Sequence, residues 1–473
     1  MKILFALILL IFVTACSHPQ EIVGEGDIIS STGNNNCSWE DQPCANYVTG
    51  DYDVTYTALP KEGWVFSEWQ GCGDQWPDCA FNVPSSTVDS LWGKTAPALT
   101  AVFAQNANSP SIITATTWSA VDATLTIDVS VSTITPTSVR LYPNGIADEW
   151  VEVDTSAPFS FTIDATAFEP GDHEILIIAN DGDISASKAE IITVSGCNGG
   201  HHLCSRPYNQ VRYATTHNAM SNSTDGWVGP NQHLDVPAQL ELGVRALMLD
   251  AWKASDENPL NGQIQLPDED PEKPFLCHAL CLLGNMPLAD GLREITDFLD
   301  ATPGQVVTII FESYISADLA SAAFEAADLK KYTYQHDGGA WPTLGQMIDA
   351  GTRLVVFQDV SVYPSYPWQM YVWDYAFETN YAAVTPEDFS CEHNRGNPSN
   401  DLFIFNNFLT NVFGSPASAA QVNHNPFLTA RITECEAFHA TMANFVTVDF
   451  ISIGDTKITV DQLNSAGSFS RQR

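Results

Sequence analysis

The sequence has few basic residues and no hydrophobic run long enough to cross a bilayer. Lysine and arginine together number 19, against 57 aspartates and glutamates, which gives a net charge of −38. This scarcity of cations excludes nucleic-acid binding through a basic surface, and an anionic membrane would repel the chain unless a cation or an anchor intervened. The longest apolar run, 3–13, is shorter than the roughly 20 residues of a membrane-spanning helix. Hydrophobic residues nevertheless make up 44% of the chain, which is ample for packed cores.

The N-terminal segment resembles a bacterial lipoprotein signal peptide. The apolar run 3–13 is followed by Thr14-Ala15-Cys16, and a short apolar segment before small residues is typical of an exported protein. The ending resembles a bacterial lipobox, whose cleavage would leave Cys16 as a lipid-modified N-terminus. Ser17, the next residue, resembles an outer-membrane sorting signal. We therefore expect the protein to be lipid-anchored to the bacterial outer membrane or cell surface, with ordinary secretion as the alternative.

The other cysteines suit an oxidising compartment, where disulfides persist. Eleven cysteines less Cys16 leave ten, an even number, and five local disulfides are the economical interpretation. The pairs suggested by proximity are Cys37 with Cys44, Cys72 with Cys79, Cys197 with Cys204, Cys277 with Cys281, and Cys391 with Cys435. Spacing alone leaves this connectivity open. No pair has the C-x2-C spacing with suitably placed histidines that a zinc site would need.

The first part of the chain is expected to contain two small all-β modules. A chain of 473 residues should form roughly two to four domains. Residues 17–30 have the composition of a tether, and 22–104 as a whole resemble a small bacterial β-repeat module. Residues 105–111 form a polar linker, and 112–195 predict a β-sandwich that resembles an immunoglobulin-like module. The modules could contact glycan or cell wall through Trp64, Trp69 and Trp76, although tryptophans of this kind more often pack in a core.

Residues 197–473 alternate strand-like runs with helical patterns, which favours parallel strands. The length suits a single (β/α)8 TIM barrel. Strand-like runs end near residues 216, 250, 280, 312, 358, 406 and 450, and the weakest strand candidate lies at 331–334. Helices are predicted over 288–299, 317–327 and 344–350. The sequence therefore predicts a multidomain protein with a C-terminal TIM barrel behind two all-β modules.

Polar side chains stand at or near the ends of several of these runs. They are His217 and Asn218, Arg245 and Asp250, His278, and Glu312. The C-terminal strand ends of such a barrel hold the active site. Two histidines with asparagine, aspartate and glutamate are the groups that a metal-assisted phosphodiester cleavage requires. Three further residues also end strands and could line the same pocket: Gln358, Asn406 and Asp449.

These motifs resemble the catalytic X region of phosphoinositide-specific phospholipase C, above all the secreted bacterial and fungal branch of phospholipase C-like phosphodiesterases. The matching stretches are 215–221, 239–250, 276–281, 306–312, 341–345, 351–356 and 448–450. The resemblance implies that His217 contacts the phosphoryl oxygens and shares in proton transfer from the inositol hydroxyl. It implies that His278 is the general acid for the departing glycerol oxygen. It also implies that Arg245 contacts phosphate or braces the carboxylates.

The same resemblance implies a cation site. Asn218, Asp250 and Glu312 match three calcium-ligand positions of the calcium-dependent enzymes, and oxygen ligands suit a hard cation. The metal-free bacterial enzymes place an arginine where this chain has Asp250. The calcium-dependent enzymes carry a glutamate where this chain has Met248, which leaves a thinner ligand set. The general base therefore stays open among His217, Glu312 and a metal-bound water. We expect calcium as the cofactor, with magnesium or no metal as alternatives.

The leading hypothesis is a cell-surface lipoprotein that cleaves a phospholipid phosphodiester at a membrane, with unphosphorylated or glycosylated phosphatidylinositol favoured over polyphosphorylated forms. A related barrel phosphodiesterase acting on glycerophosphodiesters or sphingolipids is the enzymatic alternative. Those enzymes usually show a His-Arg-Gly opening, where this chain has His217-Asn218-Ala219. An inactive surface adhesin is the non-enzymatic alternative. Both histidines argue against an adhesin, and Met248 argues mildly for one.

Overall fold

The computed structural model describes residues 16–466, apart from 43, 49–51, 73–77, 84–98, 107, 147, 254–272, 279–280, 363 and 411–412. The chain divides into two compact units. Unit 1 comprises Met1–Trp118 and Thr124–Val194, and unit 2 comprises Ser119–Ala123 and Ser195–Arg473. None of the helices in the described part of the chain is long and apolar enough to span a membrane.

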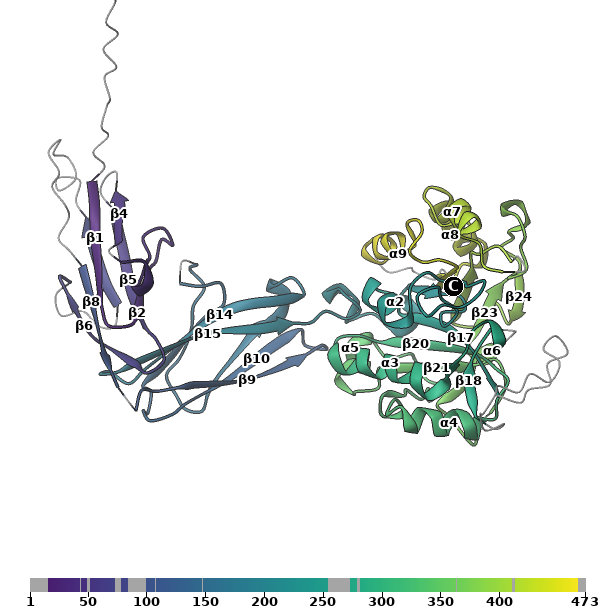
Figure 1. The fold of residues 1–473 in the computed structure, drawn as a ribbon, viewed down its shortest axis with the longest axis horizontal. Coiled ribbons are helices and arrows are strands. Elements are labelled where there is room, and N and C mark those ends of the chain that lie inside the picture. The colour runs from purple at the N-terminus through teal and green to yellow at the C-terminus, as the bar shows by residue number, and fades with distance from the viewer. Residues whose placement is uncertain are drawn as a thin grey trace, which may run out of the picture. The chain divides into compact units, whose positions relative to one another are not determined.

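Unit 1 is built from β-sheets (Figure 1). Its first strands are β1 (Cys16–Val23), β2 (Gly26–Ser30), β3 (Cys37–Ser38), β4 (Cys44–Val48), β5 (Tyr52–Pro60), β6 (Trp64–Gln70), β7 (Asp78–Val83) and β8 (Leu99–Gln105). They form two sheets with the orders β4-β1-β8-β6 and β3-β2-β5-β7. The next strands are β9 (Ile112–Ser119), β10 (Thr124–Val131), β11 (Ser138–Tyr142), β12 (Glu152–Asp154), β13 (Phe159–Asp164), β14 (Gly171–Asn180) and β15 (Ser185–Val194). They form the sheets β13-β10-β9 and β12-β11-β14-β15.

The prediction of a tether at 17–30 is wrong, because this segment forms β1 and β2. Ile22 and Ile28 are buried in the core of the first module. Burial of these two hydrophobic side chains holds the segment in the sheets of the module. Trp69 is also buried in this core, so it does not form an exposed binding face, and Trp76 lies outside the described residues.

Five disulfides join ten cysteines of the described chain. They link Cys37 to Cys44, Cys72 to Cys79, Cys197 to Cys204, Cys277 to Cys281, and Cys391 to Cys435. Two of them lie in the first module, whose small core gains from such crosslinks.

Unit 2 contains a curved sheet that is parallel along most of its length (Figure 1). Its parallel strands are β16 (Tyr213–Thr216), β17 (Ala246–Lys253), β20 (Val307–Ser313), β21 (Leu354–Gln358), β22 (Gln369–Tyr371), β23 (Ala376–Thr379), β25 (Leu402–Asn406) and β26 (Phe445–Val448). They pair in the order β22-β21-β20-β17-β16-β26-β25-β23, so that β16 lies between β17 and β26. Short antiparallel strands extend the sheet: β18 (Pro274–Leu276), β19 (Met286–Pro287) and β24 (His393–Gly396).

The sheet is open between β22 and β23. Only the one-turn helix α6 (Val372–Tyr375) connects these two strands, whereas a parallel crossover needs about a dozen residues. Among the described residues no ladder joins β22 to β23. The structure therefore shows the parallel strands of the predicted barrel in a curled sheet with one open seam.

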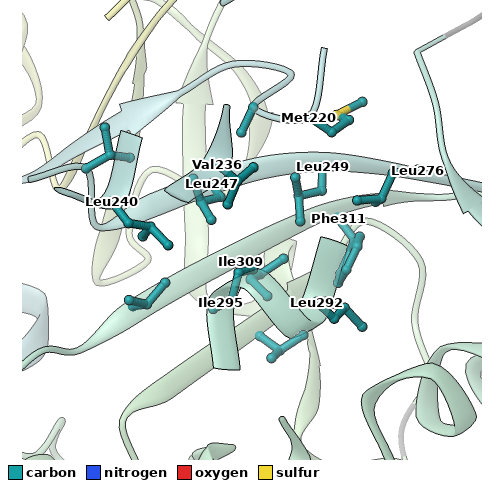
Figure 2. Packing of buried hydrophobic residues seen from close by; sticks show 14 of the residues in the cluster. Met220, Val236, Leu240, Leu247, Leu249, Leu276, Leu292, Ile295, Ile309 and Phe311 are labelled. Carbon is teal, nitrogen blue, oxygen red and sulfur yellow. The ribbon is translucent and has the colours of Figure 1, made fainter. Parts of the chain in front are cut away.

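Helices cover the outer face of this sheet and complete its core. They are α2 (Val236–Leu242), α3 (Leu288–Ala301), α4 (Ala317–Ala326), α5 (Leu344–Asp349), α7 (Pro416–Val422), α8 (Phe427–His439) and α9 (Thr456–Ser465). Figure 2 shows Leu292 and Ile295 of α3 beside Ile309 and Phe311 of β20. Burial of each such side chain stabilises the fold by roughly 1.5–3 kcal/mol. This packing fixes the strands whose ends carry the polar residues.

Two strand predictions in unit 2 are wrong. Residues 331–334 do not form a barrel strand, because 330–332 make a 3-10 turn and only Thr333 forms an isolated bridge. The run that precedes His278 is β18, an antiparallel partner of β17 rather than a barrel strand. The strands β22 and β23 were missed because three or four residues are too few to show a pattern.

Glu294 on α3 provides a pH-dependent test of this fold. Burial, reinforced by the charges of Asp225, Asp235, Asp290 and Asp297, raises the pKa of Glu294 to about 7. The folded protein binds this proton more tightly than the unfolded chain does. The resulting contribution to the free energy of unfolding is fully present below the pKa of the unfolded chain, and it is lost as the pH rises through about 7. Glu294→Gln should therefore stabilise the protein at pH 8 by roughly 1 kcal/mol, after a discount for partial exposure, and by much less at pH 5. Urea unfolding at both pH values measures this difference. Glu241→Gln, at an exposed site on α2, should change stability little at either pH, and equal effects of Glu294→Gln at both pH values would contradict the assignment.

Candidate active site

The alternation of side chains along two neighbouring strands places carboxylates inside the curled sheet. On β17, Leu247 and Leu249 face the hydrophobic core, while Met248 and Asp250 line a cavity of about 230 Å³. Asp250 pairs in register with Glu312 on β20, and Glu312 lines the same cavity. Because side chains on a strand alternate between faces, both carboxylates point inward near the C-terminal ends of their strands.

His217 directly follows β16 and is held at two places. Its Nδ1 lies 2.8 Å from Oδ1 of Asp449, which follows β26. The ring of Phe408 stacks on its imidazole, with centroids 3.9 Å apart and planes 8° apart. Asn231 donates a further hydrogen bond of 3.2 Å to the same Asp449 oxygen. These contacts leave Nε2 as the nitrogen of His217 available to the cavity.

His278 forms a second histidine–aspartate pair. Its Nδ1 lies 2.9 Å from Oδ2 of Asp250. Burial alone would lower the pKa of His278, but the hydrogen bond and charge of Asp250, with the charges of Glu312 and Asp449, raise it above its usual value. His217 and His278 line one cavity of about 210 Å³ together with Glu312. A raised pKa favours the protonated form of His278, which is the form that a proton donor requires.

Glu312 is open to the cavity but enclosed by protein. Its enclosure, and then the negative charge of Asp250, raise the pKa of Glu312 above its usual value. Tyr314 donates a hydrogen bond to its Oε1 and partly offsets this rise. Asp359, which lines the same cavity, also has a pKa raised by burial. The cavity therefore concentrates negative charge that a cation would stabilise.

Arg395 supplies a cation that sequence reasoning missed. It lies on the antiparallel strand β24, and its Nε donates a 2.5 Å hydrogen bond to the buried Glu378. Its guanidinium lies 4.6 Å from the ring centre of Trp373 and 4.9 Å from that of Tyr381. All four side chains line the larger cavity. The two rings and the carboxylate fix the guanidinium as a preorganised positive group.

The structure does not bring Arg245 into this site. Arg245 precedes the first residue of β17, whereas Asp250 lies near the other end of that strand. Its Nε donates to Gln305, and its Nη1 donates to the carbonyl oxygens of Leu240 and Val244. Burial lowers the pKa of Arg245 to about 10. The expected contact with phosphate or with the site carboxylates is therefore wrong, because the side chain lies at the amino end of the parallel strands.

The donor set fits a hard divalent cation in part. Asn218, Asp250 and Glu312 line one cavity, and their oxygens are ligands that calcium or magnesium accepts. Four carboxylates line this cavity beside a single arginine, so a cation would relieve their mutual repulsion. Within the described residues, no three His, Cys, Asp or Glu side chains form a metal cluster by themselves. Asn218 and solvent would have to complete the coordination, and Met248 contributes no charged oxygen.

Of the six residues predicted to carry the chemistry, all except Arg245 lie around the same two cavities. His217, Asn218, Asp250, His278 and Glu312 line the two cavities, which share His217 and Glu312. Asn406 and Asp449, noted in the sequence as strand ends, also line them. Gln358 does not, since its amide bonds to buried Gln369. Glu378, Asp359, Arg395 and Phe408 carried no recognisable sequence signal, because their strands or loops are short.

Two histidines with paired carboxylates, at the C-terminal ends of parallel strands, make a site suited to acid–base chemistry on an oxygen-rich substrate. The family model described as PI-PLC X 1 matches residues 203–464, more than half of the chain. The chain belongs to the PI-PLC X family. A second model, described as a bacterial Ig domain, matches residues 109–177.

Curated relatives align with the same region. A PI-PLC X domain-containing protein of Arthroderma benhamiae is 28% identical over 285 residues, which cover 55% of this chain and 86% of the relative. A PI-PLC X domain-containing protein of Arabidopsis thaliana is 28% identical, with 53% of this chain and 60% of that protein covered. A secreted protein of A. benhamiae is 25% identical, with 56% and 62% covered. The chain thus spans about three fifths of the latter two relatives.

Proposed function

We propose that this protein is a phosphoric diester hydrolase or lyase of the phosphatidylinositol phospholipase C type, as in the secreted bacterial and fungal branch of the family. One observation carries the proposal: His217 and His278 line one cavity, and each bonds through Nδ1 to its own aspartate. An imidazole oriented in this way exposes Nε2 for proton transfer. One such group can accept a proton from an attacking hydroxyl while the other donates one to a leaving oxygen.

The proposed reaction is an in-line attack by the inositol hydroxyl next to the phosphate. Nε2 of His217 accepts the hydroxyl proton as the new phosphorus–oxygen bond forms. Nε2 of His278 donates its proton to the glycerol oxygen as the phosphorus–oxygen bond to glycerol breaks. The products are a cyclic inositol phosphate and diacylglycerol. Asp449 and Asp250 orient the two rings and stabilise their positive forms.

Arg395 replaces Arg245 as the positive side chain in this proposal. Its guanidinium, fixed by Glu378, Trp373 and Tyr381, would bind oxygen atoms of the headgroup or phosphate. The remaining carboxylates of the cavity, Glu312 and Asp359 among them, would repel extra phosphate groups. This charge balance favours unphosphorylated or glycosylated phosphatidylinositol over polyphosphorylated headgroups.

Calcium is the proposed cofactor, with Asn218, Asp250 and Glu312 as the residues that would hold it. When bound, the cation would lower the pKa of the attacking hydroxyl and neutralise charge on the transition state. Asp250 has one oxygen engaged by His278, which leaves the other for a cation. Met248 occupies the wall beside them, so we expect weak calcium binding, with magnesium or no metal as alternatives.

We propose that the curled sheet of unit 2 is an open form of the (β/α)8 barrel, with its seam between β22 and β23. We also propose that the protein works outside the cytoplasm, since it contains five disulfides, and disulfides persist in oxidising compartments but are rare in the cytosol. Lipidation at Cys16 would anchor it to the outer membrane or cell surface. The β-modules, which lie between Cys16 and most of unit 2 along the chain, would then act as a spacer, with glycan or cell-wall contact as a further role.

Turnover on phosphatidylinositol vesicles tests this function. The protein should release cyclic inositol phosphate, and calcium should restore activity lost in a chelator by roughly 10²-fold or more. Activity unchanged by chelator would remove the metal from the account and assign charge neutralisation to Arg395. No turnover by the folded protein with calcium, magnesium or chelator would contradict the proposed substrate, and would favour glycerophosphodiesters, sphingolipids or the adhesin hypothesis.

A further inference from the structure

Two contacts constrain the imidazole ring of His217: a hydrogen bond at its edge and an aromatic ring stacked on its face. The hydrogen bond between Nδ1 and Asp449 fixes which nitrogen points away from the cavity. A single hydrogen bond fixes the tilt of the ring plane only loosely. The parallel ring of Phe408, with centroids 3.9 Å apart and planes 8° apart, restricts this tilt by direct contact. Phe408 therefore determines the plane in which Nε2 points into the cavity.

Phe408 is itself held by the polypeptide behind it. It is buried and follows the last residue of β25 by two positions. The preceding residue, Asn407, donates its backbone N–H to the carbonyl oxygen of Thr447 on β26, at 2.8 Å. The Asn407 side chain donates to the carbonyl oxygen of Val422 at 3.1 Å. These bonds fix the turn that presents the aromatic ring.

Arg431 on α8 supports the same turn from the other side. Its Nη1 donates to the carbonyl oxygen of Asn406 at 3.1 Å and to Oδ1 of Asn407 at 2.8 Å. The guanidinium lies over the rings of Phe389 and Phe405, at 3.6 Å and 4.4 Å from their centres. Burial lowers the pKa of Arg431 to about 9. Among the described residues no carboxylate lies within ion-pair distance of it, so its bonds to the turn are its main polar compensation.

The same buried network reaches the carboxylate partner of His217. Asn423, which follows α7, donates from Nδ2 to the carbonyl oxygen of Asp449 at 2.9 Å. Its Oδ1 lies 3.5 Å from Nδ2 of Asn407. One set of buried polar groups therefore fixes both neighbours of His217, the ring on its face and the carboxylate at its edge.

We infer that Phe408 is a positioning residue for His217, which sets the direction of Nε2 through ring stacking. This inference rests on the proposed function for its kinetic consequence, but not for the contact itself. A misdirected Nε2 would weaken proton transfer in the transition state without removing a substrate contact. The loss should therefore appear in kcat rather than in KM.

Kinetics of two substitutions test the inference. Phe408→Leu removes the ring at similar bulk and should lower kcat by roughly 10–100-fold with KM changed by less than about threefold. Phe408→Tyr keeps the ring and should retain kcat within about threefold of the wild type. Phe377→Leu is the matched control, because Phe377 is a buried ring stacked on Phe403, with centroids 4.6 Å apart, in the same unit. It should lower the melting temperature at least as much as Phe408→Leu and leave kcat near the wild-type value.

Nuclear magnetic resonance of histidine-labelled protein tests the contact without turnover. A proton over an aromatic face is shifted upfield, so the His217 ring protons, assigned by their loss in His217→Gln, should be upfield in wild type and Phe408→Tyr. They should move downfield in Phe408→Leu. Unmoved resonances, or a kcat loss shared equally by Phe377→Leu, would overturn the inference. Shifted resonances in a protein without phosphatidylinositol turnover would support the contact and overturn the proposed function instead.

Discussion

Replacing His278 by alanine should lower the turnover of phosphatidylinositol by roughly 10³-fold, since positioned general acids contribute about 10²–10⁴-fold. The glycerol alkoxide is a poor leaving group and needs a proton as its bond to phosphorus breaks. His278 carries that proton because Asp250 bonds to its Nδ1 at 2.9 Å and raises its pKa. The measurement is steady-state turnover on vesicles, with circular dichroism to verify folding.

A substrate with a better leaving group separates acid catalysis from binding. An inositol phosphate ester of 4-nitrophenol releases a stable anion that needs no proton, so the same substitution should cost it roughly tenfold or less. His173→Ala, at a histidine of unit 1 that bonds to the carbonyl oxygen of Glu169, should leave both substrates unaffected. Equal losses on the two substrates would show that His278 does not act as the acid.

Exchanging Asp449 for asparagine should also lower kcat by roughly 10²-fold or more, because an uncharged amide no longer stabilises the positive form of His217 that forms during proton transfer. Oδ1 of Asp449 accepts hydrogen bonds from His217 and from Asn231. An asparagine would keep its amide oxygen at this place, because Asn231 also donates there, but the amide carries no negative charge. Without that charge, the positive form of His217 that arises when Nε2 accepts the substrate proton is less stable.

A carboxylate elsewhere in unit 2 serves as the control for Asp449. Asp349 accepts hydrogen bonds from the backbone of Ala120 and Val121 and lies outside both cavities. Asp349→Asn should reduce the melting temperature without a comparable loss of kcat. A loss of kcat no greater for Asp449→Asn than for Asp349→Asn would contradict the role of the His217–Asp449 pair.

Much of the site followed from local pattern. Asp250 and Glu312 were predictable because a residue at the end of a hydrophobic strand run lies at the carboxyl edge of the sheet. His217 and His278 followed from the same runs and from the family resemblance, although β18, before His278, is antiparallel rather than part of the barrel. Position in the run also explains Arg245, which precedes β17 and so lies at the opposite edge from Asp250.

The missing parts depend on tertiary contacts that leave little local signal. Arg395 lies in the short strand β24, whose four residues are polar and largely exposed. Its ion pair with Glu378, from β23, and its contacts with Trp373 and Tyr381 bring it to the cavity. In the sequence nothing distinguishes Phe408 from the other aromatic residues near β25. Its proposed role depends on stacking against a histidine almost 200 positions earlier in the chain. The hydrophobic periodicity of one sequence does not predict such contacts between residues that are distant in the chain.

The central claim is that the two histidine–aspartate pairs cleave a phosphodiester by intramolecular attack. Phosphorus nuclear magnetic resonance of the products from phosphatidylinositol vesicles in calcium tests it most directly. The account predicts a five-membered cyclic phosphate as the first product, absent from a protein with both His217 and His278 replaced by alanine. A wild-type protein that forms only an acyclic phosphate monoester from the start, or a double variant that still forms the cyclic product at the wild-type rate, would contradict it.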